Sequence, residues 1–512
     1  MAQIFRGLLA IAVVAALLPI YAGAASRRDD AGDLVVADAT AAPTVLDPFR
    51  VYGTQAQSFF RLIFEPLFDR ASDGTIRTPL LERWGPVDRL TWEFRLRPGV
   101  RFHDGGELTA ADVVYSIGRI VDPQVNSPRR HEFGEIDTIV AADHLTVRIT
   151  TKRPYALLPA RLSQFSMVLP DRMRGRDAAD FFREPIGLGP FKLTELNSRQ
   201  AILGAFADYH GGAPKVPRVV FQFIPEAEER LRQLLGGSVD IVTNLLPQQV
   251  DSLLRSRGVR LLKRNSIRFT EVFLDARDGP LSRAETRRAL LHGTDVESLV
   301  RYVARGNGQA IATVTLPEDF GFHAGLKPYS FDPSKARTLL AQAGYPNGFP
   351  LQGLATHDTQ TLATALAQQW GKIGVKLDFT VEGRAQAVNR WIRERDRHSF
   401  LIADPTSIIF DAAFQLRVHL DPAHPMARAS HPRAVELLNR ADSEQDVTAR
   451  ASLLRDVQSL AYEDALTHPI YQVVDLYGVR DRVTDFVPSA DTILRLGLVG
   501  LTPMRRQAAG GQ

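Results

Sequence analysis

The sequence contains no cysteine among its 512 residues. A chain without cysteine has no disulfide framework, no thiolate nucleophile and no zinc site with cysteine ligands. It also has no thiol to which a lipid could be attached after processing. Its stability must therefore come from hydrophobic cores.

Long hydrophobic runs are also missing, except near the amino terminus. Arg6 precedes an apolar run from Gly7 to Leu18, and Ala22-Gly23-Ala24 fits a small-residue cleavage site. Because this run is shorter than the roughly 20 residues that a transmembrane helix needs, we predict a secretory signal peptide, residues 1–24, that is removed. A secreted chain without a lipid anchor is retained only behind an outer membrane, which predicts the periplasm of a two-membrane bacterium.

The chain has little excess charge of either sign. It has 62 Lys and Arg against 58 Asp and Glu residues, a formal net charge of +4. The basic residues are scattered and few of them alternate with aromatics in the way a nucleic-acid surface requires. We therefore predict no nucleic-acid partner.

Motifs for catalysis are absent. No G-x-S-x-G elbow and no S-x-x-K nucleophile occurs, and His131-Glu132 lacks the second histidine of the zinc-protease motif. His103-Asp104 could act as a base and its orienting acid, but its place before a helix favours a structural part in the turn. The sequence predicts a protein that is not an enzyme and has no cofactor.

Three histidines in a loop-like stretch could bind a metal. His419, His424 and His431 lie near Asp411 and Asp421, but two of these histidines precede prolines. We favour structural or solvent-exposed positions for them and predict no metal site.

Gly187-Leu188-Gly189 could be mistaken for the beginning of a phosphate-binding loop. Pro190 removes a backbone donor where such a loop needs one, and no Lys-Ser or Lys-Thr follows at the required place. A tight crossing of the chain is the better interpretation of these glycines.

A chain of this length is too long for one core. Its patterns predict strands at 33–38, 219–224 and 270–276, and helices at 335–345 and from Phe59 up to the break at Pro66. Because helices and strands alternate irregularly, the fold class is α/β, with two main lobes and one extra lobe.

The segment from Leu90 to Ile120 has the clearest local pattern. Apolar and polar residues alternate from Leu90 to Leu96, which predicts a half-buried strand, and the alternation resumes at Val100 and Phe102 after a turn. Thr109 and Asp112 have the spacing of a capping box at the start of a helix. We predict a strand-turn-strand-turn-helix unit.

The same segment resembles a known family. The run LRPGVRFHDGGELTAADVVYS is similar to the signature of family 5 extracellular solute-binding proteins, the peptide, nickel and opine receptors of ABC importers. Further similarity lies in PIGLGPFKLTEL, GGSVDI and KARTLLAQAGY, which begin at Pro185, Gly236 and Lys335. The resemblance covers about residues 33 to 500.

The resemblance implies a periplasmic-binding-protein-like fold of the cluster C type. Two main lobes then surround a ligand cleft, and hinge closure traps the ligand. The implied parts are lobe I at 25–65, 187–276 and 478–504, the extra lobe II at 66–186, and lobe III at 277–477. Residues 505–512 are a tail that we expect to be disordered.

The resemblance also carries ligand contacts onto this sequence. The contact strand of lobe I falls on Tyr52, Gly53 and Thr54, and the crossing segment on Thr243 and Asn244. The acid that pairs with a ligand's amino terminus in peptide receptors falls on Asp404, with His398 or Arg393 as the basic partner for a carboxylate. The motif around Asp404 departs from the family, which usually shows an aromatic residue before A-D-Y-x-D-P, whereas LIADPTSIIF at 401–410 shows none there.

These implications define the predicted function. The chain is expected to be a monomer that captures a peptide-like solute and delivers it to an ABC permease and ATPase complex in the inner membrane. A metal, metallophore or opine receptor of the same fold is the alternative, since the departure at Asp404 leaves the ligand class open. A secreted hydrolase on a two-lobe scaffold is the alternative of another class.

Overall fold

The computed structural model describes residues 32–50, 56–71, 74–175, 181–394 and 397–502. The predicted signal peptide at 1–24, the contact residues Tyr52, Gly53 and Thr54, and the tail at 505–512 lie outside the described residues.

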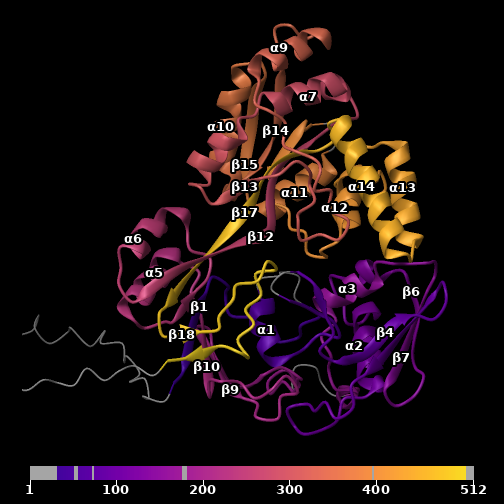
Figure 1. The fold of residues 1–512 in the computed structure, drawn as a ribbon, viewed down its shortest axis with the longest axis vertical. Helices are drawn as coiled ribbons and strands as arrows, with labels where there is room; N and C mark the ends of the chain where they lie inside the picture. Colours follow the sequence, from indigo (N-terminus) through magenta and orange to yellow (C-terminus); the bar gives the residue numbers. More distant parts are fainter. Residues whose placement is uncertain (1–31, 51–55, 72–73, 176–180, 395–396, 503–512) are drawn as a thin grey trace, which may run out of the picture.

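One large sheet runs through most of the molecule (Figure 1). Its strand order is β15-β14-β16-β12-β17-β11-β1-β10-β9-β8, and β13 pairs with β17. The strands β12 (Val259–Leu274) and β17 (His468–Arg480) are antiparallel partners and much longer than the others. They connect an upper body with a lower body, so any movement between the two must bend this pair.

The upper body contains a small parallel sheet. Strand β14 (Pro350–Thr356) pairs in parallel with β15 (Lys376–Glu382) and with β16 (Phe400–Ala403). Leu366 and Trp370 pack on one face of this sheet, whereas Trp391 packs on the other face beside Leu354 and Leu401. The remaining elements of this body are β13 (Gly308–Ala310) and α7 (Ala284–His292), α8 (Val296–Ser298), α9 (Pro333–Gln342), α10 (Gln360–Gly371), α11 (Arg384–Arg393), α12 (Ala412–Leu420), α13 (Pro432–Ser443) and α14 (Val447–Glu463).

The lower body holds a second group of parallel strands. Strand β1 (Leu34–Asp38) pairs in parallel with β10 (Arg218–Phe223) and β11 (Ile241–Val242). Strands β9 (Gln200–Ala205) and β8 (Phe191–Leu196) extend the sheet in antiparallel pairs. The helices of this part are α1 (Gln57–Ile63), α5 (Ala227–Gly236) and α6 (Val250–Leu254), and the short strands are β2 (Asp69–Arg70), β3 (Ile76–Arg77), β18 (Val483–Thr484) and β19 (Gly500–Leu501).

A separate four-stranded sheet occupies the lower right of Figure 1. Its order is β4 (Leu81–Pro86), β5 (Thr91–Leu96), β7 (Thr146–Thr151) and β6 (Ile136–Ala141), with α2 (Ala110–Val121) and α3 (Leu158–Phe165) beside it. Its core continues into α12, α13 and α14 of the upper body, because residues of all these elements belong to one hydrophobic cluster. The two bodies therefore touch on this side.

The predicted strand and capped helix are confirmed within this sheet. Trp92, Phe94 and Leu96 of β5 are buried, and the Asp112 carboxylate accepts a hydrogen bond from the Thr109 backbone N–H at 2.7 Å. The second strand predicted at Val100 and Phe102 is wrong, since only an isolated bridge joins Arg101 to Glu107 there. The turn at Asp104-Gly105-Gly106 closes too soon for a longer ladder to form.

Two other predicted boundaries differ from the structure. The helix expected from Phe59 to Pro66 is α1, which begins at Gln57 and ends at Ile63. The strand expected at 270–276 is the end of β12, which begins at Val259. The polar half of β12 lacks a clear alternation, so the sequence pattern showed only its buried end.

The glycines Gly187 and Gly189 form a close crossing, as predicted. A Cβ atom on Gly187 would lie 2.0 Å from the Ile63 carbonyl oxygen, so only glycine fits there. His103 completes this crossing, because its Nδ1 accepts from the Gly187 N–H at 3.3 Å and its Nε2 donates to the Gly189 carbonyl at 2.9 Å. The structure thus gives His103 a structural position.

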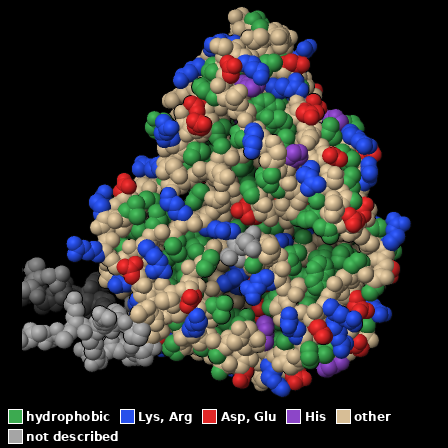
Figure 2. All heavy atoms as spheres, viewed as in Figure 1, with side chains coloured by type: hydrophobic (Ala, Val, Ile, Leu, Met, Phe, Trp, Pro, Cys, Tyr) green, Lys and Arg blue, Asp and Glu red, His purple; other side chains and the backbone are tan. Residues whose placement is uncertain are grey.

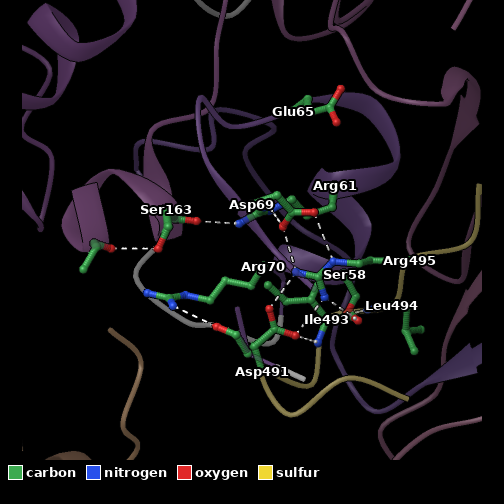
Figure 3. A network of polar contacts seen from close by, with 12 residues as sticks. Ser58, Arg61, Glu65, Asp69, Arg70, Ser163, Asp491, Ile493, Leu494 and Arg495 are labelled. Carbon is green, nitrogen blue, oxygen red and sulfur yellow. Dashed lines mark hydrogen bonds and ion pairs between the residues drawn. The ribbon is translucent and has the colours of Figure 1, made fainter. Parts of the chain in front are cut away.

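The carboxyl-terminal segment returns to the lower body through a buried ion-pair network (Figure 3). Arg495 contacts Asp69 at 2.8 Å and Asp491 at 2.7 Å, and Arg61 of α1 contacts the same Asp69 at 2.7 Å. Burial alone would raise the pKa of Asp69, but the charges of Arg495 and Arg61 lower it well below its usual range. The network fixes the last segment of the chain to α1 and β2.

Candidate functional site

The carboxyl ends of the parallel strands in the upper body meet at one edge. Strand β14 is followed by His357 and Asp358, β15 by Arg384 and β16 by Asp404. In open α/β sheets, ligands bind outside the carboxyl ends of the strands. This edge is the first candidate for a ligand site.

A cavity of about 580 Å³ separates this edge from the four-stranded sheet. Its upper wall includes Arg384, Ala403 and Thr406, and its lower wall includes Glu135 and Tyr155. Figure 2 shows the face hollowed at mid-height, where the upper body meets the lower body, with Lys and Arg side chains around the hollow. The volume lies within the usual range for small-molecule sites, and such sites prefer domain interfaces.

Asp404 is the most distinctive group at the edge. Its Oδ1 accepts a hydrogen bond from the Thr270 hydroxyl of β12 at 2.6 Å. Burial raises the pKa of Asp404, although this hydrogen bond and the charges of Arg268 and Arg384 act in the opposite direction. Among the described residues no cation forms an ion pair with Asp404, so its carboxylate has only a neutral partner there.

The long strands place further polar groups beside Asp404. Thr270 lies opposite Tyr471 in the β12–β17 ladder, and burial raises the pKa of Tyr471 to about 12. Arg268 forms an ion pair with Asp475 across the same two strands. Thr270 thus joins Asp404 to β12, one of the two strands that connect the bodies.

Thr243 and Asn244 lie in the lower body, at the carboxyl end of β11. The Thr243 hydroxyl donates to Asp38 at the end of β1 at 2.8 Å, and Arg230 donates to the Thr243 and Asn244 carbonyls at 3.1 and 2.8 Å. Asn244 has a φ of +50°, a conformation that asparagine tolerates better than most residues. The sequence therefore predicted residues at the carboxyl ends of strands in both bodies.

His398 and Arg393 do not lie beside Asp404. His398 precedes β16 and Asp404 follows it, which separates them by about 20 Å along the strand. His398 is hydrogen-bonded to Glu394 at 3.2 Å, and Arg393 is exposed at the end of α11. Arg384 is the basic residue nearer to Asp404, and it follows β15 at the same edge of the sheet.

The three histidines have separate partners, and His419 lies within α12 rather than in the predicted loop. His419 binds the buried Glu271, His424 accepts from the Met426 N–H, and His431 accepts from the Ala434 N–H as the N-cap of α13. In the part of the chain that the structure describes, no group of three or more His, Asp and Glu side chains is arranged to hold a metal ion. None of the helices that the structure describes is long and apolar enough to cross a membrane.

Comparison with known proteins agrees with this architecture. The chain is 27% identical over 390 residues to the glutathione-binding protein GsiB of Escherichia coli K12, a match that covers 74% of each protein. The structure of HbpA2 from Haemophilus parasuis superposes with a TM-score of 0.83 at 24% identity, covering 92% of this chain and all of that one. The peptide complex of DppA from Helicobacter pylori gives a TM-score of 0.76 at 24% identity, covering 92% and 98% of the two chains.

A family assignment follows from a match to a family as a whole. Residues 75–424 match the family described as bacterial extracellular solute-binding proteins, family 5. The match includes the four-stranded sheet, the crossing at Gly187 and Gly189, and the edge that carries Asp404. This chain belongs to the bacterial extracellular solute-binding proteins of family 5.

Proposed function

We propose that the protein captures a peptide-like solute between its two bodies in the periplasm and delivers it to an ABC permease. The observation that carries this proposal is the half-buried Asp404 carboxylate at the carboxyl end of β16, bonded only to the Thr270 hydroxyl among the described groups. Its chain neighbours Ala403 and Pro405 line the cavity of about 580 Å³. A carboxylate in this position binds an ammonium group through a charge-assisted hydrogen bond. The amino terminus of a peptide is such a group.

Arg384 supplies the opposite charge at the same edge. Its side chain is exposed and lines the cavity, and none of the described carboxylates forms an ion pair with it. A guanidinium group can bind a carboxylate in a bidentate manner. Together, Asp404 and Arg384 suit a solute that carries an amine at one end and a carboxylate at the other.

Closure of the two bodies around the solute depends on the long strands β12 and β17. The proposed lobes are I (25–65, 187–276 and 478–504), II (66–186) and III (277–477). Within these bounds β17 crosses from lobe III to lobe I, while β12 belongs to lobe I and pairs at its end with β16 of lobe III. Bending of β12 and β17 brings the carboxyl edges of both bodies together around the solute. The protein then acts as a monomer, and the permease with its ATPase recognises the closed form.

The test is identification of the bound solute and its dependence on Asp404. Purified protein is denatured, the released solute is identified by mass spectrometry, and its affinity is measured by calorimetry with glutathione and short peptides included. Asp404→Asn should weaken binding about ten- to hundredfold. Asp378→Asn, an exposed aspartate on β15, is the matched control and should bind as the wild type does.

The chemistry of the solute provides a second check. N-acetylation of a bound peptide should weaken wild-type binding as much as Asp404→Asn does, and should add little in that variant. Equal binding of the acetylated and free peptides would contradict the proposal. Release of an opine or a metallophore would mean that the protein is a receptor for that ligand class rather than for peptides. Chemical conversion of the added solute would instead indicate a hydrolase.

A further inference from the structure

A second cavity, of about 540 Å³, lies between the four-stranded sheet and the α13–α14 connection. Trp84, Trp92 and Ala160 line it from the lower body, and Glu318 and Glu444 line it from the upper body. None of these residues lines the cavity at the β14–β16 edge. The two cavities are therefore distinct sites.

Aromatic rings form much of the wall of this second cavity. Trp84 of β4 and Trp92 of β5 stack with ring centroids 6.0 Å apart and an angle of 25° between their planes. They are diagonal neighbours on one face, since Trp92 lies opposite Pro86 in the ladder. Trp84 is 39% exposed, which leaves part of its ring open to a ligand.

Two further rings lie across the cavity, and each already holds a cation. Arg70 stands 4.5 Å from the centre of the Phe410 ring, and Arg450 stands 4.9 Å from that of Phe320. The cavity thus already has two cation–π contacts with its own arginines. The tryptophan pair is the aromatic surface of the wall that remains for a ligand.

The charges of the lining are unbalanced. Its acids are Glu318, Asp319, Asp411 and Glu444, and its bases are Arg70 and Arg450. Asp411 and Arg450 neutralise each other in a bidentate pair at 2.6 and 3.0 Å. Arg70 donates instead to the Gly74 and Ile409 carbonyls at 2.9 and 2.5 Å.

The other three carboxylates have only neutral partners among the described residues. Glu318 accepts from the Gln472 amide at 3.0 Å, and Glu444 accepts from the Asp446 N–H at 2.8 Å. Asp319 accepts from the Ser407 hydroxyl at 2.7 Å and from the Leu316 N–H at 2.8 Å. Even while Asp319 holds a proton, Glu318 and Glu444 against Arg70 leave an excess of negative charge in an aromatic cavity.

We propose that this cavity binds an organic cation of the quaternary-ammonium class. Such a cation has apolar groups on its charged nitrogen, so it loses little hydration on entering and gains from both aromatic faces and nearby carboxylates. Small, strongly hydrated cations lack this advantage. The proposal goes beyond peptide capture, because it assigns another ligand to another site.

Binding here would also link the two bodies. The tryptophans belong to the lower body, whereas Glu318 and Glu444 belong to the upper body, and Gln445 already donates to the Asp88 carbonyl across the junction at 3.5 Å. A cation between them contacts both sides at once. It therefore favours the arrangement in which the bodies touch.

The experiment compares choline with its neutral isostere 3,3-dimethylbutan-1-ol. Choline at millimolar concentration should bind by calorimetry and change the tryptophan fluorescence, while the neutral isostere binds at least about tenfold more weakly. Equal binding of the two compounds, or no binding of choline, would overturn the proposal.

Substitutions in the lining of the second cavity test whether choline binds there. Trp84→Ala and Glu444→Gln should each weaken choline binding about tenfold, and both positions are accessible enough to be changed without loss of the fold. Glu436→Gln, an exposed glutamate of α13, the helix that ends just before Glu444, is the matched control. Unchanged choline binding by Trp84→Ala would contradict the assignment.

The two proposals can fail separately. Asp404→Asn should leave choline binding unchanged, because Asp404 does not line this cavity. Loss of choline binding in that variant would place choline in the peptide site and overturn this inference alone. The peptide-capture proposal is tested only by the binding of the peptide-like solute and its dependence on Asp404.

Discussion

His419 Nε2 lies 2.8 Å from each carboxylate oxygen of Glu271, and both side chains are buried. The histidine ring also stacks on Phe273, with the ring planes 4° apart. Glu271 pairs with Ala403 in the sheet, directly before Asp404. A buried ion pair thus supports the strand end that carries the proposed ligand group.

The first prediction concerns this pair. Glu271→Gln should lower the free energy of unfolding by about 3 kcal/mol, because it leaves a buried imidazolium without its counter-charge. Glu271 raises the pKa of His419 above its ordinary value of 6.5, although burial acts in the opposite direction. The contribution of the imidazolium is therefore complete at pH 6.5 and is lost as the pH rises through the raised folded-state pKa of His419. At lower pH, protonation of Glu271, whose pKa burial also raises, breaks the pair.

A double-mutant cycle with His419→Gln, followed by urea unfolding, measures this coupling. The double variant should lose clearly less stability than the sum of the two single losses. Simple additivity would show that the two side chains do not depend on each other.

The second prediction concerns His103. Burial lowers its pKa to about 4, so the ring stays neutral while it binds the Gly187 and Gly189 backbone. His103→Ala should cost about 2–4 kcal/mol at pH 8, since two buried backbone groups lose their partner. Between pH 6.5 and 4 the unfolded chain binds a proton that the folded one does not, so this stabilisation falls as the pH falls.

Thermal unfolding from pH 4 to pH 8 checks this prediction. His144→Ala, an exposed histidine of the same sheet region, serves as the control and should not change the unfolding temperature. A constant difference between His103→Ala and the wild type at every pH would contradict a neutral buried ring.

Much of the local structure could be predicted from short-range sequence patterns. The Thr109–Asp112 capping box and the alternation of β5 depend on residues within a few positions, so the sequence displayed them. The tight crossing at Gly187 could also be predicted, because Pro190 argued against a phosphate-binding loop there. The partner that makes glycine necessary, Ile63, lies far away in the sequence and could not be predicted.

The site was less predictable because its contacts are long-range. Thr270 and Asp404 are separated by 134 residues and Glu271 and His419 by 148, and no periodic pattern links such pairs. The resemblance implied Asp404 and, as the basic partner for a ligand's carboxylate, His398 or Arg393, and the structure places the last two before β16 and Asp404 after it. Arg384 becomes a candidate because ligands bind outside the carboxyl ends of strands in open α/β sheets. The family motifs do not contain that information.

The third prediction tests the network of the carboxyl-terminal segment. Asp69→Asn should cost about 3 kcal/mol, because it removes the buried carboxylate that forms ion pairs with both Arg61 and Arg495. Asp485→Asn removes an exposed pair with Lys215 and is the matched control, whose denaturation midpoint should not change. Equal effects of both substitutions on urea unfolding would contradict the importance of burial.

The fourth prediction concerns Asp319 in the second cavity. Burial raises its pKa from 3.8 to about 7, and the neighbouring charges of Asp411 and Glu318 add to this effect. Arg70, the nearest lining cation, interacts with Asp319 but donates its hydrogen bonds to carbonyl groups. Between pH 3.8 and 7 the folded state holds a proton that the unfolded chain has released, so stability falls as the pH rises through this interval.

Asp319→Asn removes this dependence while keeping the shape of the side chain. Relative to the wild type, the variant should therefore gain stability as the pH rises from 4 to 8, by up to roughly 4 kcal/mol. Denaturation by urea at several pH values measures this difference, with Asp378→Asn as the exposed control on β15. If both variants followed the wild-type pH profile, Asp319 would have to be ionised throughout, and a described cation other than Arg70 would have to approach it.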